Sequence, residues 1–169
     1  MNDAPGAVQR ADRLPAGRLL ALDVGERRIG AAVGDAPGWL ARPLTVIERT
    51  SRAQDFARIV QLVNEQGAVG IVVGYPLNDD GTAGPQAQQT ARYARRLAQA
   101  VTVPVMLWDE RLSTFVAQDL RREAQATPHT RRQPPLDALA AAVILQSYLD
   151  AFQQVASESG SVAPTRQPE

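Results

Sequence analysis

The sequence contains no cysteine, no lysine and a single histidine among its 169 residues. Without cysteine, the chain can form neither disulfide bonds nor thiolate metal sites. No apolar run is long enough to cross a bilayer, and the N-terminal residues include no apolar segment of the kind found in signal peptides. We therefore expect a cytoplasmic protein with no membrane partner.

The chain also lacks net charge, because 18 arginines balance 18 acidic residues. A neutral chain argues against nucleic-acid binding by overall electrostatic attraction. Each cluster of arginines could belong to a solvated surface, whereas several clusters at one edge of the fold would form a phosphate-binding rim. The clusters lie at residues 27–28, 92–96, 111, 121–122 and 131–132.

The composition predicts one domain at residues 18–153 between two disordered ends, residues 1–17 and 154–169, which have little apolar surface. Within the domain, short segments rich in valine, isoleucine and leucine predict strands, and helical spacing of apolar residues predicts helices. The predicted strands are 18–24, 28–35, 40–47, 69–73 and 103–108, and the predicted helices are 51–66, 85–100, 113–124 and a last one from 135.

This order of elements predicts an α/β fold with a five-stranded mixed sheet. The first three strands form a meander, and helical crossovers then bring the fourth and fifth strands parallel to the first. Numbered along the chain, the strands have the expected spatial order 3-2-1-4-5. The carboxyl ends of strands 1, 4 and 5 then lie side by side, where open α/β sheets carry their sites.

Acidic residues from three distant segments fall at that edge. Asp23 closes the first strand, Glu110 follows the fifth, and Asp137 lies at the start of the last helix. Strands 1 and 5 are roughly 10 Å apart, so carboxylates leaning inward over Gly74 could share two divalent ions about 4 Å apart. Mg²⁺ prefers oxygen ligands and needs only a few carboxylates.

Each acid also has a simpler interpretation. Asp23 can cap the turn after its strand, since aspartate commonly bonds its own backbone there. Asp137 can be favoured by the helix dipole, and Asp109 or Glu110 can pair with Arg111. Taken together, however, three acids at one predicted sheet edge favour a metal site.

A loop at residues 74–86 leaves the same edge of the sheet. Its run of Asn78, Asp79, Asp80 and Gly81 is typical of a surface turn. The following Gly-Pro pair opens a helix whose amide groups could meet a phosphate, so the loop could also contact a substrate. The lone histidine, His129, could assist proton transfer or be incidental.

Four segments together make the chain resemble the YqgF family, and they span residues 19–150 in the family's order. Members of this family are described as bacterial Holliday-junction resolvases and pre-ribosomal-RNA nucleases with an RNase H-like fold. The four segments are "LALDVGERRIGAAVGD", "IVVGYPLNDDGTAGPQAQ", "WDERLST" and "DALAAAVILQSYLD".

The resemblance implies a hydrolase that cleaves phosphodiester bonds in structured nucleic acid with Mg²⁺ or Mn²⁺, and a part in maturing the end of small-subunit ribosomal RNA. Asp23, Glu110 and Asp137 match the family's acids and would hold the ions. We expect pre-rRNA, and also branched or single-stranded DNA, as substrates, and a monomer or a homodimer. The residues expected near the phosphates are Arg28, Asn78 and Arg111.

Two departures from the family pattern leave an alternative open. The segment before Asp137 has fewer basic residues than is common in the family. Residues 75–77, after the fourth strand, include no acid, whereas better-known nucleases of this fold have one there. A non-catalytic RNA-binding assembly factor with a decayed metal site would share these features. A third hypothesis is nucleotide binding, because "DVGERRIG" looks like the phosphate-binding hairpin of actin-like ATPases. Those enzymes close two such domains around the nucleotide, whereas one short domain is expected here.

Overall fold

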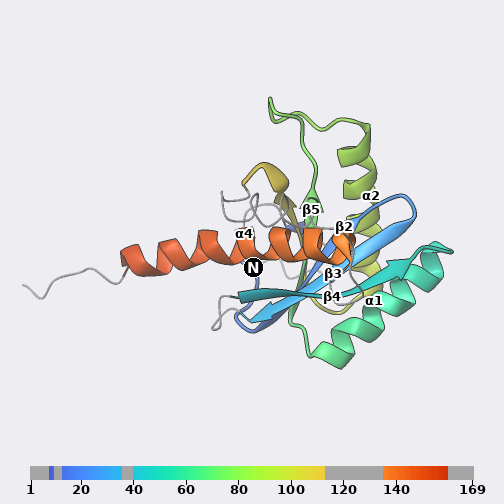
Figure 1. Ribbon diagram of the computed structural model, residues 1–169, viewed down its shortest axis with the longest axis horizontal. Coiled ribbons are helices and arrows are strands. Elements are labelled where there is room, and N and C mark those ends of the chain that lie inside the picture. Colours follow the sequence, from blue (N-terminus) through green and yellow to red (C-terminus); the bar gives the residue numbers. More distant parts are fainter. Residues whose placement is uncertain (1–7, 10–12, 36–39, 113–134, 160–169) are drawn as a thin grey trace, which may run out of the picture.

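The computed structural model describes residues 8–9, 13–35, 40–112 and 135–159 (Figure 1). They form a six-stranded mixed sheet with the strand order β1-β6-β5-β2-β3-β4. Read from β4 to β6, the five longer strands have the predicted order 3-2-1-4-5, which confirms the predicted α/β topology. The predicted helix at 113–124 and His129 lie outside the described residues.

The meander consists of β2 (Arg18–Val24), β3 (Arg28–Asp35) and β4 (Leu40–Glu48). Both pairings are antiparallel, and the one between β2 and β3 runs over the full length of β2. The register between β3 and β4 shifts beside Pro43, a residue that has no N–H to donate to the ladder.

Two helical crossovers build the parallel part of the sheet. The elements are α1 (Arg52–Gln66), β5 (Gly70–Tyr75), α2 (Pro85–Ala100) and β6 (Val105–Asp109). β5 pairs in parallel with both β2 and β6, as a strand–helix–strand connection requires. The carboxyl ends of β2, β5 and β6 therefore meet at one edge of the sheet.

Local signals fix the ends of α1 as the sequence predicts. The Ser51 hydroxyl accepts a hydrogen bond from the Gln54 amide at 3.2 Å, and Gly67 ends the helix in the left-handed conformation with φ 62°. The Gln54 side chain does not complete a capping box, because its oxygen accepts from the Thr50 hydroxyl instead. One half of the predicted capping box is thus present.

The N-terminal segment contributes a short strand that the sequence did not predict. β1 (Val8–Gln9) pairs in parallel with β6, placing Val8 opposite Val105. Further along, Leu14 is only 3% exposed, and its backbone N–H donates to the Tyr148 hydroxyl at 3.0 Å. Part of the segment expected to be disordered therefore packs on the domain, because Leu14 supplies apolar surface that the composition of the whole segment concealed.

The last helix extends beyond the predicted end of the domain. α4 (Leu136–Ser159) continues past the expected boundary at residue 153, since neither glycine nor proline occurs in it before Gly160. Among the described residues, no helix is both long and apolar enough to cross a membrane.

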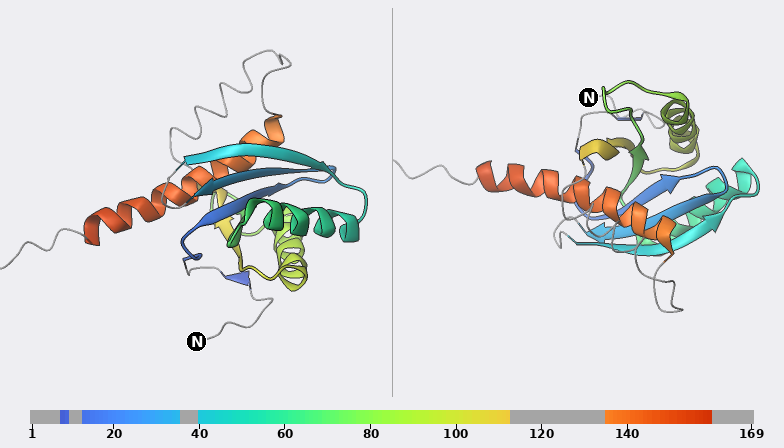
Figure 2. Two further views of the ribbon diagram at one scale, coloured as in Figure 1. Left: turned by 90° about the horizontal axis from the view of Figure 1, so that it is seen from below. Right: turned by 45° about the horizontal axis from the view of Figure 1, so that its top comes forward.

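Helices cover both faces of the sheet, with α1 and α2 on one face and α4 on the other (Figure 2). Side chains of β2 alternate between the two cores. Leu20 and Leu22 pack in the core on the α1 and α2 face, whereas Leu19 and Ala21 pack in the core under α4. This alternation determines which face each residue at the end of β2 presents.

Candidate functional site

Asp23 faces the same side of the sheet as α4. It follows Leu19 and Ala21 in the period-two alternation of β2, and both of these residues pack under α4. Asp23 is half-buried and lies opposite Gly30 in the pairing with β3. The aspartate of the first strand therefore points to the face on which the last helix begins.

Glu110 reaches the same face from the end of β6. It opens a short 3-10 helix, η1 (Glu110–Leu112), directly after Asp109. Its Oε1 lies only 2.6 Å from the point that a Cβ on Gly74 would occupy, so the carboxylate rests against the backbone of β5. The sequence predicted a carboxylate leaning over Gly74, and the structure has this arrangement.

Asp137 reaches the site through the start of α4. The backbone of this first turn packs so closely on β3 that its carbonyl oxygen lies 1.8 Å from where a Cβ on Gly30 would be. Because Gly30 is the cross-strand partner of Asp23, the close approach brings the start of α4 beside the end of β2. The Asp137 carboxylate forms an ion pair with the Arg28 guanidinium at 3.0 Å.

The three predicted acids thus share one face and one edge of the sheet. They do not form a preformed metal cage, since no group of three histidine or acidic side chains within the described ranges stands close enough to hold an ion. The donor set consists of carboxylate oxygens, which suits Mg²⁺ or Mn²⁺. The missing side chain of Gly74 leaves room for the Glu110 carboxylate, and that of Gly30 leaves room for the backbone of the first turn of α4, whose Asp137 carboxylate pairs with Arg28.

Arg111 is exposed, yet its side chain is bonded to protein groups on two sides. Its side chain makes a two-pronged ion pair with Asp109, the closest contact being 2.7 Å, and it donates to the Asp79 carbonyl oxygen at 3.1 Å. The hydrogen bonds from Arg111 lower the pKa of Asp109. The pairing of Asp109 with Arg111 that the sequence left open is therefore present, and it ties the end of β6 to the loop at residues 76–84.

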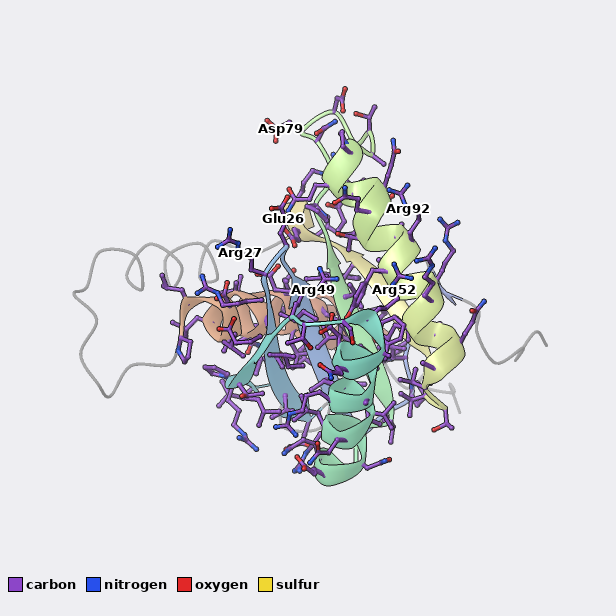
Figure 3. All side chains as sticks on the ribbon, turned by 90° about the vertical axis from the view of Figure 1, so that its right-hand side faces the viewer. Glu26, Arg27, Arg49, Arg52, Asp79 and Arg92 are labelled. Atoms are coloured by element: carbon purple, nitrogen blue, oxygen red, sulfur yellow. The ribbon has the colours of Figure 1, made fainter. Side chains whose placement is uncertain are left out.

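Asn78 is engaged within that loop. Its side-chain amide donates to the Thr82 hydroxyl at 2.9 Å, while Asp80 accepts from both the backbone N–H and the hydroxyl of Thr82. These hydrogen bonds lower the pKa of Asp80. Asp79 lies near the tip of the projecting loop, and none of these contacts leads to Asp23 or Glu110 (Figure 3).

A second feature of the same edge was not identified from the sequence. On the α1 and α2 face, a pocket of about 660 Å³ opens between the β2–β3 turn and the two helices. Arg92 and Arg96 belong to a cluster that the sequence shows, but Arg49 and Arg52 stand singly around a helix cap. Arg49 and Arg52 lie within one turn of the start of α1, and Arg92 and Arg96 lie one turn apart on the same stripe of α2. These spacings are the signal in the sequence.

Comparison with known proteins identifies the family. A family model described as "RuvX: Holliday junction resolvase" matches residues 17–151. A protein of Thermoanaerobacter pseudethanolicus described as "Putative pre-16S rRNA nuclease" is 44% identical over 133 residues, covering 79% of this chain and 96% of the relative. One of Symbiobacterium thermophilum with the same description is 47% identical over 134 residues, covering 79% of this chain and 92% of the relative.

A solved structure supports the fold. The RuvC structure of Thermus thermophilus superposes with a TM-score of 0.50 at 18% identity, covering 80% of this chain and 96% of RuvC. The expected RNase H-like architecture is thereby confirmed. The chain belongs to the RuvX family of Holliday junction resolvases, as its resemblance to the YqgF family indicated.

Proposed function

We propose that the protein is a divalent-metal-dependent endonuclease of the cytoplasm that hydrolyses phosphodiester bonds in structured nucleic acid. The observation that carries the proposal is the convergence of Asp23, Glu110 and Asp137 on one face of one sheet edge from segments far apart in the chain. Family membership supports the same activity, since the matching family is one of resolvases.

In this proposal Asp23, Glu110 and Asp137 hold the cation. The bound ion would activate water and stabilise the leaving oxygen of the phosphodiester. The ion pair engages one oxygen of the Asp137 carboxylate, and the exposed Arg28 side chain can turn toward solvent when a cation binds. Arg28 is then placed to meet a substrate phosphate, which arginine binds through paired N–H groups.

We assign Arg111 and Asn78 to the substrate side of the site. Arg111 positions the loop at residues 76–84 through its bonds to Asp109 and the Asp79 carbonyl. Asn78 shapes the same loop through Thr82. Both residues would present the loop to nucleic acid, with direct phosphate contact following if these bonds open.

We infer that the physiological substrate is the 5′ end of pre-16S rRNA, with Holliday junctions as a further substrate. The first inference rests on the description of two relatives more than 40% identical to this chain, and the second on the description of the family model. Metal-bound carboxylates face the same phosphates in RNA and DNA, so the acids alone do not select between them.

The test is a cleavage assay of wild type and Asp23→Asn on matched pre-rRNA, single-stranded DNA and four-way-junction substrates with Mg²⁺ or Mn²⁺. We expect Asp23→Asn to fold and bind as wild type does but to lose cleavage. Asp35→Asn is the matched control, because Asp35 lies at the opposite end of β3 in an ion pair with Arg18. Cleavage by Asp23→Asn at the wild-type rate would overturn the mechanism.

A second candidate function is a non-catalytic RNA-binding assembly factor. The ion pair between Arg28 and Asp137 favours it, because an arginine in the place of a cation neutralises one of the three acids. Calorimetric titration with Mn²⁺ distinguishes the two: binding that disappears in Asp23→Asn supports the nuclease, and absence of binding by wild type supports the assembly factor.

A further inference from the structure

A pocket on the face of the sheet opposite α4 carries several basic side chains. It has a volume of about 660 Å³ and opens between the β2–β3 turn, the start of α1 and the part of α2 from Pro85 to Arg96. Figure 3 shows Arg49 and Arg52 near the start of α1, Arg92 on α2 and Glu26 in the turn. The fourth arginine of the lining is Arg96.

The pocket has excess positive charge. Glu26 is its only acidic lining residue, and no ion pair joins Arg52, Arg92 or Arg96 to an acid in the part of the chain that the structure describes. Arg92 and Arg96 are also one helical turn apart, where like charges repel each other. A neutral protein that keeps uncompensated arginines around one hollow offers a site for an anion.

Arg49 is held in place at the inner side of this pocket. Its Nε binds the carboxylate of Asp55, which is 2% exposed, at 3.0 Å, and its Nη1 donates to the Gly25 carbonyl oxygen at 2.8 Å. The guanidinium also lies over the ring of Tyr93, 5.1 Å from the centroid. The arginine therefore connects the β2–β3 turn to both helices. Buried Asp55 balances its charge, so the excess positive charge of the pocket comes from Arg52, Arg92 and Arg96.

Tyr93 gives an independent indication of a ligand. The residue lines the pocket and is 7% exposed, and its buried hydroxyl has no hydrogen-bond partner among the described residues. A tyrosine hydroxyl is protonated at neutral pH, and burial raises the pKa of Tyr93 further, so the group is a donor there. An unpartnered buried hydroxyl is costly. A small movement of the side chains that cover it would let an anionic oxygen in the pocket supply the missing acceptor.

We propose that this pocket binds the phosphate backbone of the same nucleic acid whose cleavage is proposed above. Val24 and Gly25 line it directly after Asp23, so one strand passing over the β2–β3 turn would contact the acids on one face and the arginines on the other. Arginine is well suited to phosphate because its planar fork donates two hydrogen bonds. The inference thus rests on the proposed nuclease function and adds a second contact region to it.

The test measures binding without cleavage. Fluorescence anisotropy with labelled pre-rRNA and junction DNA, in EDTA and across a range of salt, compares wild type with Arg92→Gln/Arg96→Gln. Losing two phosphate contacts should reduce the slope of log affinity against log salt by about 1.4 on single-stranded RNA and about 1.8 on duplex arms, which is roughly 25-fold and 60-fold weaker binding near 0.1 M salt. The control is Arg42→Gln/Arg95→Gln, which removes two exposed arginines outside the pocket lining.

Equal loss of affinity in the pocket variant and in the control would overturn the proposal. It would also be overturned if ATP or inorganic triphosphate bound the pocket and oligonucleotides did not. Because EDTA prevents metal-dependent cleavage, the binding result holds even if the wild-type protein proves unable to cut, so the two proposals fail separately.

Tyr93→Phe provides a second readout. Removing an unpartnered hydroxyl should raise the melting temperature of the free protein, yet weaken oligonucleotide binding if the hydroxyl donates to a phosphate. A purely structural tyrosine would raise the melting temperature and leave the affinity unchanged, which would count against the proposed donor.

Discussion

Replacing Gly30 by alanine should separate the start of α4 from the sheet. The new Cβ would lie 1.8 Å from the Asp137 carbonyl oxygen and 2.2 Å from its carbonyl carbon. A relaxed C···O contact is about 3.3 Å, so the helix backbone would have to retreat by about 1.5 Å. Backbone atoms on both sides cannot rotate away as a side chain does.

This displacement places the cost at the upper end of the range for overpacking, about 3 kcal/mol. For a chain of this size the melting temperature should fall by about 6–12 °C. Cleavage should fall further than stability at a temperature where the variant remains folded, because Asp137 moves away from Asp23. Thermal unfolding followed by circular dichroism and a cleavage assay on the same preparation measure the two effects.

Gly67→Ala is the matched control. Gly67 has φ 62° and open space around its missing Cβ, so alanine should cost roughly 1 kcal/mol of backbone strain and leave cleavage unchanged. If Gly30→Ala melts within about 2 °C of wild type and cuts normally, the argument that close backbone packing positions Asp137 is refuted.

Two further substitutions test neighbouring parts of the site. Gly74→Ala would bring a Cβ within 2.5 Å of the Ile144 Cδ1 and 2.6 Å of the Glu110 Oε1. Both atoms are ends of flexible side chains, so we expect about 1 kcal/mol of destabilisation in urea titrations and a larger loss of cleavage. Unchanged cleavage would contradict the placement of Glu110. Because hydrogen bonds from Arg111 lower the pKa of Asp109, their stabilisation is complete above about pH 4 and is lost as the pH falls through the lower folded-state value. Asp109→Asn should therefore lower the urea midpoint at neutral pH more than in acid, and an equal decrease at both would argue against this ion pair.

The main topology is predictable from the sequence because each signal is local. Ser51 and Gly67 mark the ends of α1 through their own hydrogen bonding and backbone conformation, and both act as predicted. β1 was not predictable, because two residues in a proline- and alanine-rich segment are too few to show the alternation of apolar and polar residues that marks a strand. Their strand conformation depends on pairing with β6. α4 passes the predicted domain boundary at residue 153 because the polar residues that follow it include no helix breaker before Gly160.

The candidate site was predictable to a similar depth. Strand parity and strand order are enough to bring Asp23 and Glu110 to one edge, and the glycine at position 74 anticipates a close approach. The pair between Arg28 and Asp137 was not predictable, because it depends on the angle at which α4 crosses β3. The arginine pocket was missed for the same reason: its members meet only when α1 and α2 pack side by side on the far face.

The two outer strands of the sheet have a consequence for how the folded molecules meet one another. β1 pairs with Val105 and Met106 at the start of β6, so this part of the strand does not offer bare N–H and C=O groups to a neighbouring chain. β4, at the opposite border, is interrupted by Pro43 and carries the exposed charge of Arg42. Short pairing strands, prolines and exposed charges resist edge-to-edge pairing, so the two borders of this small sheet are poor templates for adding a strand from another copy of the chain.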